Sequence, residues 1–221
     1  MPGLILIPTP LELSVITASL PSAALSDWDL ELCGFGPIAA ASRSAALIER
    51  MKPEQVLLIG IAGSFGDLAI GSAATFAQVH CWGIGVGSGV AHQGADAMGF
   101  PQWAGFPVGA GSPVGMGDSS IGQVIELPTS RSPHVLLTCC SASANQHEAD
   151  LKRAAVPAAA AEDMEGFGVA LSCRIAEVPL TIIRGISNHV GERNQEHWQI
   201  EPALQAAAAL ATSEIRPRES A

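Results

Sequence analysis

The chain has 221 residues and a mass of 22.7 kDa, with 48% hydrophobic and 14% charged residues. This composition is typical of globular proteins and excludes a disordered tail. Because a formal net charge of −10 repels phosphate backbones and anionic lipids, we expect neither a nucleic acid nor a membrane surface as partner.

A chain of this length can bury roughly 70% of its unfolded surface in one core. We therefore expect a single domain over residues 1–216, followed by a short tail over 217–221 that frays. The first apolar run ends at Pro8, too early for a signal peptide or a membrane anchor. The five cysteines are odd in number and lack metal-ligand spacing, so we expect a reducing cytoplasm and no metal.

The first third of the chain predicts alternating strands and helices. Residues 4–7 form a continuous apolar run, which is typical of a strand buried on both faces. We then expect a helix over 11–20, a strand over 29–33, a turn over 34–36, a helix over 37–51 and a buried strand over 56–59. A strand, helix and strand in this order imply a parallel pair of strands.

The remainder of the chain predicts fewer strands and more helix. We expect strands over 72–79, 134–138 and 180–184, and helices over 145–155, 164–176 and 201 to about 213. Residues 83–118 are rich in Gly, Pro, Ser and Ala, which indicates mostly loop, although a missed strand remains an alternative.

One glycine motif follows a predicted strand and opens a predicted helix. Gly34, Gly36 and Ala39 match the spacing of the dinucleotide fingerprint GxGxxG/A. That fingerprint also needs an acid at the end of the next strand, but the strand ending at Ile59 continues into glycine and alanine. This disfavours nicotinamide or flavin binding and leaves a tight strand-to-helix turn or a nucleoside pocket.

Five short segments along the chain occur in a characteristic order. They are Pro8–Glu12, Gly34–Gly36, Gly60–Gly63, Glu162–Gly166 and Arg184–Asn188. Because these segments follow one another in this order, the chain resembles the family of nucleoside phosphorylases and nucleosidases. The resemblance implies an α/β fold, a three-layer αβα sandwich with a mixed, mainly parallel central sheet. It further implies a small-molecule nucleoside substrate, no cofactor and a homo-oligomer.

The resemblance also implies roles for individual residues. Glu12 would activate a water molecule, although the helix dipole alone also favours an acid in the first turn of a helix. Glu165 would accept hydrogen bonds from the ribose hydroxyls while Met164 packs on the sugar; a dipole role for this acid is the alternative. Further substrate contacts are expected from Ala62, Gly63, Arg184 and Ser187. Gly166 and Gly168 predict close approach of either a ligand or a packed strand.

Asn188 bears on the identity of the base. Nucleosidases that act on adenine nucleosides have Asp at this place and use it as proton donor to the purine N7. An asparagine cannot do so, but its N–H can pair with a carbonyl O6 while its oxygen accepts the proton that develops on N7. We therefore expect a 6-oxopurine base, and residues 186–194 look most like the branch of the family that releases hypoxanthine.

Three alternatives remain open. Hexameric bacterial phosphorylases carry phosphate ligands where this chain has Leu58 and Ile61, which favours hydrolysis over phosphorolysis. A methylthioadenosine-type nucleosidase and a non-catalytic nucleoside-binding protein are the others. Residues 138–144 should complete the base pocket, and the part that reads the distal end of the substrate is unassigned.

Overall fold

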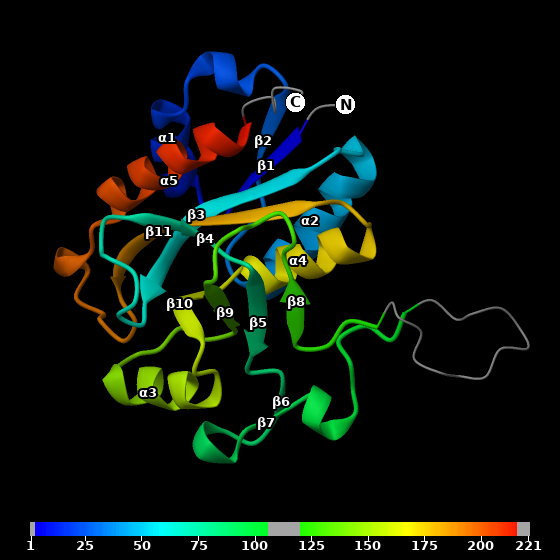
Figure 1. Ribbon diagram of the computed structural model, residues 1–221, viewed down its shortest axis with the longest axis vertical. Coiled ribbons are helices and arrows are strands. Elements are labelled where there is room, and N and C mark those ends of the chain that lie inside the picture. The colour runs from blue at the N-terminus through cyan, green and yellow to red at the C-terminus, as the bar shows by residue number, and fades with distance from the viewer. Residues whose placement is uncertain (1–2, 106–119, 216–221) are drawn as a thin grey trace, which may run out of the picture.

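The structure is a computed structural model that describes residues 3–105 and 120–215, so the predicted tail over 217–221 and part of the predicted loop over 83–118 lie outside it (Figure 1). The strands of its main sheet are β1 (Gly3–Ile7), β2 (Trp28–Leu32), β3 (Val56–Ser64), β4 (Ala73–Thr75), β5 (Gln78–Trp82), β8 (Val124–Glu126), β9 (Val135–Cys139), β10 (Ala159–Asp163) and β11 (Leu180–His189). The α-helices are α1 (Pro10–Ser19), α2 (Pro37–Met51), α3 (Gln146–Ala155), α4 (Gly166–Ile175) and α5 (Ile200–Ile215).

Within the described residues the main sheet has nine strands, and its longest path runs β2-β1-β3-β10-β9-β5-β8. β11 lies off this path and pairs with β3 and β4. The pairs β1–β2, β1–β3, β3–β11, β9–β10 and β5–β9 are parallel, whereas β3–β10, β4–β11 and β5–β8 are antiparallel. The predicted mixed, mainly parallel sheet is confirmed.

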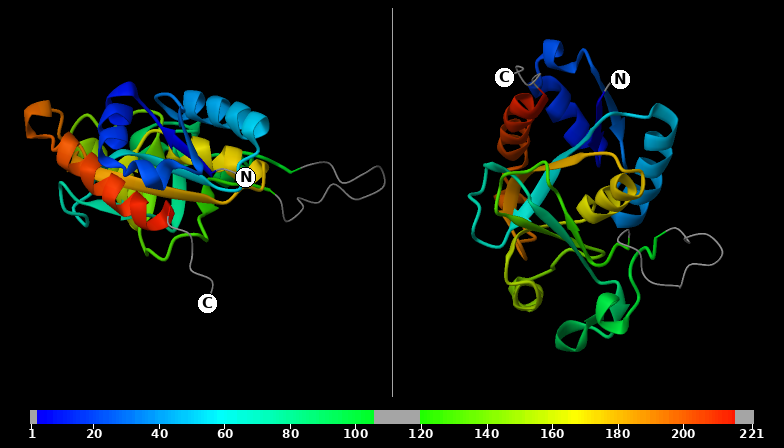
Figure 2. Two further views of the ribbon diagram at one scale, coloured as in Figure 1. Left: turned by 90° about the horizontal axis from the view of Figure 1, so that it is seen from above. Right: turned by 45° about the vertical axis from the view of Figure 1, so that its right-hand side comes forward.

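Helices cover both faces of this sheet, which confirms the three-layer αβα sandwich (Figures 1 and 2). Side chains alternate along β1, so that Leu4 and Leu6 face α2 and α4 while Ile5 and Ile7 face α1 and α5. Such a strand is apolar at every position because both of its faces are buried. A hairpin of β6 (Gly85–Val86) and β7 (Gln93–Gly94) lies outside the main sheet.

The expectation of one strand over 72–79 was wrong. β4 pairs antiparallel with β11, and β5 pairs parallel with β9, so the chain changes partner strand between Thr75 and Gln78. One continuous strand cannot serve both partners. No apolar periodicity marks this change.

Other boundaries also differ from the expectations. β10 was missed because three of its five residues are alanine, although all five are buried. β3 and β11 run beyond Ile59 and Arg184 because they pair with each other to Ser64 and His189. α4 begins at Gly166, with Glu165 as its N-cap. Within the described residues, no helix is long and apolar enough to cross a membrane.

Candidate active site

A cavity of about 420 Å³ opens where β1, β3, β10 and β11 end. Of the predicted site residues, Glu12, Ala62, Gly63, Met164, Glu165, Ser187 and Asn188 line it. Gly63 lies at the centre of this group, since β-sheet pairing places Asn188 on one side of it and Glu162 on the other. Arg184 does not line the cavity, because its side chain is fully buried behind the wall.

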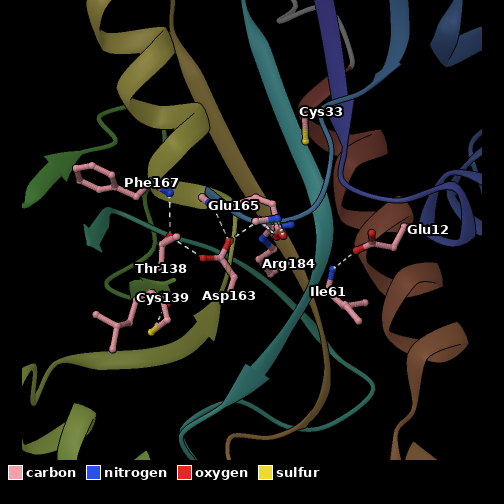
Figure 3. Close-up of polar contacts among 12 residues, drawn as sticks. Glu12, Cys33, Ile61, Thr138, Cys139, Asp163, Glu165, Phe167 and Arg184 are labelled. Carbon is pink, nitrogen blue, oxygen red and sulfur yellow. Dashed lines mark hydrogen bonds and ion pairs between the residues drawn. The ribbon is translucent and has the colours of Figure 1, made fainter. Parts of the chain in front are cut away.

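Glu12 is held in place by the start of α1 and by β3 (Figure 3). Thr9 is the N-cap of α1; its hydroxyl accepts from the Glu12 backbone N–H and donates to Glu12 Oε2 at 2.6 Å. The Ile61 backbone N–H donates to Glu12 Oε1 at 3.0 Å. Each carboxylate oxygen therefore has one protein donor and keeps a lone pair for a further donor. Such a carboxylate can orient a water molecule in the cavity.

Two carboxylates share the buried guanidinium of Arg184 (Figure 3). Arg184 Nη2 donates to Asp163 Oδ2 and lies 3.4 Å from Glu165 Oε2. Asp163 also accepts from the Thr138 hydroxyl at 2.6 Å and from the Gly166 N–H at 2.8 Å. These bonds fix the end of β10 and the start of α4, and therefore the position of Glu165.

The carboxylate of Glu165 has an unusual environment. Burial raises its pKa to about 7, although the positive charge of Arg184 opposes the shift. The Gly36 N–H donates to Glu165 Oε1 at 2.9 Å. Gly36 has φ +83°, a conformation that favours glycine, so the predicted glycine turn serves this site by holding Glu165.

Gly60 is required by the approach of two side chains to β3. A Cβ atom at this position would overlap Arg184 Nη1 and would lie 2.8 Å from Glu12 Oε1. Burial by itself would lower the pKa of Arg184, but the negative charges of Asp163, Glu165 and Glu12 together raise that pKa above its ordinary value. Glu12, Asp163 and Glu165 thus form one acidic group around a single guanidinium.

Ser187 and Asn188 are neighbours in β11, and both line the cavity. A register shift between Ile186 and Asn188 breaks the alternation of faces that a regular strand would impose. The Ser187 hydroxyl donates to Asn188 Oδ1 at 2.7 Å, and Asn188 Nδ2 donates to the His189 carbonyl at 2.8 Å. The second contact of Nδ2, with the Glu192 carbonyl, is 3.5 Å long and weak. The amide is therefore oriented but keeps hydrogen-bonding capacity toward the cavity.

Glu162 is a cavity residue that the sequence reasoning missed as a site residue. Its buried carboxylate accepts from the Ser143 N–H at 2.7 Å, the Ser143 hydroxyl at 2.8 Å and Lys152 Nζ at 2.9 Å. Lys152 also donates to the Ser141 carbonyl at 2.7 Å. These bonds hold residues 141–143, and Ala142 among them lines the cavity within the segment predicted to complete the pocket. Nothing in the local sequence indicates a pair ten residues apart on α3 and β10.

The loop after β11 supplies a further part of the wall, which the sequence left unassigned. Arg193, Gln195 and Trp198 line the cavity together with Ile200, the first residue of α5. The Arg193 guanidinium lies over the Trp198 ring, 4.9 Å from its centroid. This arrangement is a cation–π contact at the cavity wall.

The two glycines of α4 have a structural explanation. A Cβ at Gly168 would lie 2.5 Å from the Pro37 carbonyl oxygen of α2, and a Cβ at Gly166 would crowd Asp163, Leu136 and Thr138. Gly168 is thus required by helix–helix packing, so the expectation of a ligand or a strand at that position was wrong. Among the described residues, no group of three or more His, Cys, Asp and Glu side chains could hold a metal ion.

Comparisons with known proteins agree on one family. A model described as the phosphorylase superfamily matches residues 30–216. A futalosine hydrolase of Streptomyces coelicolor is 30% identical over 213 residues, which cover 86% of this chain and 79% of that protein.

Solved structures share the fold. The 5'-methylthioadenosine/S-adenosylhomocysteine nucleosidase of Colwellia psychrerythraea, in complex with adenine, has a TM-score of 0.73 at 19% identity and covers 97% of this chain and 94% of its own. The native futalosine hydrolase of Helicobacter pylori has a TM-score of 0.70 at 18% identity and covers 96% of each chain.

Proposed function

The chain belongs to the phosphorylase superfamily, and from that membership we propose that it hydrolyses the N-glycosidic bond of a 6-oxopurine nucleoside, futalosine, and releases hypoxanthine. This reaction belongs to a route of menaquinone biosynthesis. The observation that carries the proposal is the placement of Glu12, Glu165 and Asn188 around one cavity. A base, an acceptor for sugar hydroxyls and an amide that reads a purine edge are the groups that such a reaction needs.

The reaction breaks the bond between C1′ of the ribose and N9 of the purine. The electron pair of that bond goes to the purine, which is protonated at N7 from solvent, and the ribose becomes an oxocarbenium-like cation. Water held by Glu12 then attacks C1′ and loses a proton to the Glu12 carboxylate. Asn188 accepts the N7–H and donates to O6, which stabilises the leaving base.

Glu165 acts on the sugar. In its ionised form it accepts hydrogen bonds from ribose hydroxyls, and these bonds strengthen as the sugar becomes cationic. Arg184 and the Gly36 N–H hold the carboxylate in place from behind. Arg184 is thus proposed as a positioning residue for Glu165, rather than as the direct substrate contact that the resemblance implied.

The environment of Glu12 supports hydrolysis over phosphorolysis. Leu58 is fully buried in the core, and the Ile61 N–H is already occupied by Glu12. Neither residue therefore offers a donor to a phosphate ion in the cavity. We accordingly expect base release that needs no phosphate.

Incubation with futalosine, inosine and methylthioadenosine, with and without phosphate, tests the proposal. Chromatography should detect hypoxanthine and free sugar from futalosine in phosphate-free buffer. A strict need for phosphate, with a ribose 1-phosphate product, would identify a phosphorylase. Preferred cleavage of methylthioadenosine would identify the other nucleosidase type. Thermal stabilisation by nucleosides without any product would favour the non-catalytic binder.

The choice of base is tested separately at Asn188. We expect futalosine to exceed its 6-amino analogue by at least about a hundredfold in kcat/KM, since an unmatched donor in a buried site is costly. Asn188→Asp should narrow that ratio, because a carboxyl group can protonate N7 and accept from an amino group. Equal rates on the parent, or an unchanged ratio in the variant, would show that Asn188 does not read the base.

We propose a homo-oligomer, which the exposed apolar side chains of Phe35 and Ile38 support because large exposed apolar groups favour association. Sedimentation measures the number of subunits. We further propose a reducing cytoplasm, since all five cysteines are free thiols.

A further inference from the structure

Hydrogen bonds hold the loop between β11 and α5 against β11, the strand that contains Asn188. The Glu192 carbonyl oxygen accepts from Trp198 Nε1 at 3.2 Å and lies 3.5 Å from Asn188 Nδ2. The Glu192 carboxylate accepts from the Asn194 N–H at 2.7 Å and contacts His197 Nδ1 at 3.0 Å. The Gln199 N–H donates to the Ser187 carbonyl at 2.8 Å. These bonds hold Arg193 and Trp198 at a defined place on the cavity wall.

Arg193 differs in charge from the rest of that wall. The lining includes the four acids Glu12, Glu162, Asp163 and Glu165, and Arg193 is its only lysine or arginine among the described residues. Arg184 and Lys152 lie behind the wall, and each is paired with a buried carboxylate. Within residues 3–105 and 120–215, Arg193 has no carboxylate partner among the ion pairs. Its charge is therefore available to a bound anion.

Apolar side chains line the same cavity as Arg193. Trp198 lies beneath the guanidinium, and Leu11 of α1 and Ile200 of α5 line the same cavity. α1 and α5 pack side by side (Figure 1). Apolar side chains and one arginine in the same cavity suit an aromatic ring that bears a carboxylate, because the guanidinium fork pairs with both carboxylate oxygens.

We propose that Arg193 and Trp198, with Leu11 and Ile200, form the subsite for the carboxyphenyl end of the nucleoside's 5′ substituent. The inference rests on the proposed function, because that function supplies a substrate with a carboxyphenyl group. Asn188 and Glu165 are assigned to base and sugar, whereas these four residues line the same cavity and have no role in either assignment. An anion elsewhere in the cavity would face the four acids. The subsite would therefore select futalosine over nucleosides that have a neutral 5′ group.

Three substrates and three variants test the subsite. The substrates are futalosine, its methyl ester, which keeps the ring but lacks the charge, and inosine, which lacks the substituent. The variants are Arg193→Gln, Arg193→Lys and, as a control for net charge, Arg43→Gln on the exposed face of α2. Thermal unfolding of each variant verifies that the fold is retained.

For Arg193→Gln we expect kcat/KM on futalosine to fall by roughly 10- to 100-fold, mostly through KM, because a charged hydrogen bond is lost. The kcat/KM of this variant on the ester and on inosine should differ from that of the parent by less than about threefold. Such a difference is too small for the loss of a charged hydrogen bond. Arg193→Lys should recover part of the loss on futalosine, and Arg43→Gln should match the parent.

The outcomes separate the subsite from the proposed function. If the parent releases hypoxanthine from futalosine but Arg193→Gln does so equally well, the subsite is refuted and the function stands. An equal loss on all three substrates would mean that Arg193 supports the loop and does not bind the carboxylate. No turnover of futalosine by the parent would overturn the function and the subsite together.

Discussion

Replacing Glu165 by glutamine should stabilise the protein above pH 7 and impair catalysis. The folded-state pKa of Glu165 is about 7, against 4.5 for the ordinary carboxyl group, and burial is the largest cause. Because the folded protein binds more protons than the unfolded chain between these values, the contribution of Glu165 to stability falls as pH rises through this window. Glutamine carries no charge and removes that dependence.

The size of the effect follows from the pKa difference. A pKa of about 7 in the folded protein against the ordinary 4.5 means that ionised Glu165 lowers the free energy of unfolding by roughly 3 kcal/mol at alkaline pH. Glutamine has one oxygen, so it can accept from Gly36 or face Arg184, and losing one of the two contacts costs about 1 kcal/mol. At pH 8 we therefore expect the free energy of unfolding of Glu165→Gln to exceed that of the parent by roughly 2 kcal/mol, and its Tm to be higher by roughly 4–8 °C. At pH 4.5 the gain should vanish.

Urea and thermal unfolding from pH 4.5 to 8.5 measure this effect. Glu214→Gln is the matched control, because it removes an exposed carboxyl group on α5. The same Glu165 variant should lose roughly 10²-fold in kcat, since an amide nitrogen cannot accept from a ribose hydroxyl. Parallel stability curves for parent and variant, or a variant that is less stable at pH 8, would refute the reasoning.

Three further substitutions test the site and its support. Glu12→Gln should lose roughly 10²–10⁴ in kcat with little change in KM, as expected for one general base, and activity within a few-fold of the parent would reduce Glu12 to a partner of the helix dipole. Lys152→Met should lower the free energy of unfolding by roughly 3–5 kcal/mol because it leaves the buried Glu162 carboxylate without its cation, and adding Glu162→Gln should recover part of that loss; equal stability of single and double variants in urea would contradict this. Gly168→Ala should lower stability by roughly 1–3 kcal/mol despite the better helix propensity of alanine, because the new Cβ meets the Pro37 carbonyl of α2, and an unchanged Tm would argue against that clash.

Local patterns were sufficient for the elements whose burial is uniform. The run over residues 4–7 is apolar throughout because β1 is covered on both faces, and the proline at position 37 marks the first residue of α2. The order of short motifs also predicted that Glu12, Glu165 and Asn188 belong to one site, and the structure has all three lining one cavity.

Pairing between distant segments was beyond the reach of local patterns. β10 is a strand because it lies between β9 and β3, not because of its alanines, and β11 extends to His189 because β3 is there to pair with it. Lys152 meets Glu162 only after α3 and β10 have packed together.

The sequence by itself determined the fold class, the family and several of the side chains that line the cavity, because periodicity and short motifs are local properties of the chain. Only the tertiary structure decided that Arg184 lies behind the wall, that Glu162 joins the cavity and that Arg193 is its one lining lysine or arginine within the described residues. The physical reason is that burial, ion pairing and pKa depend on which distant groups come within a few ångströms, and strand pairing and helix packing set those distances.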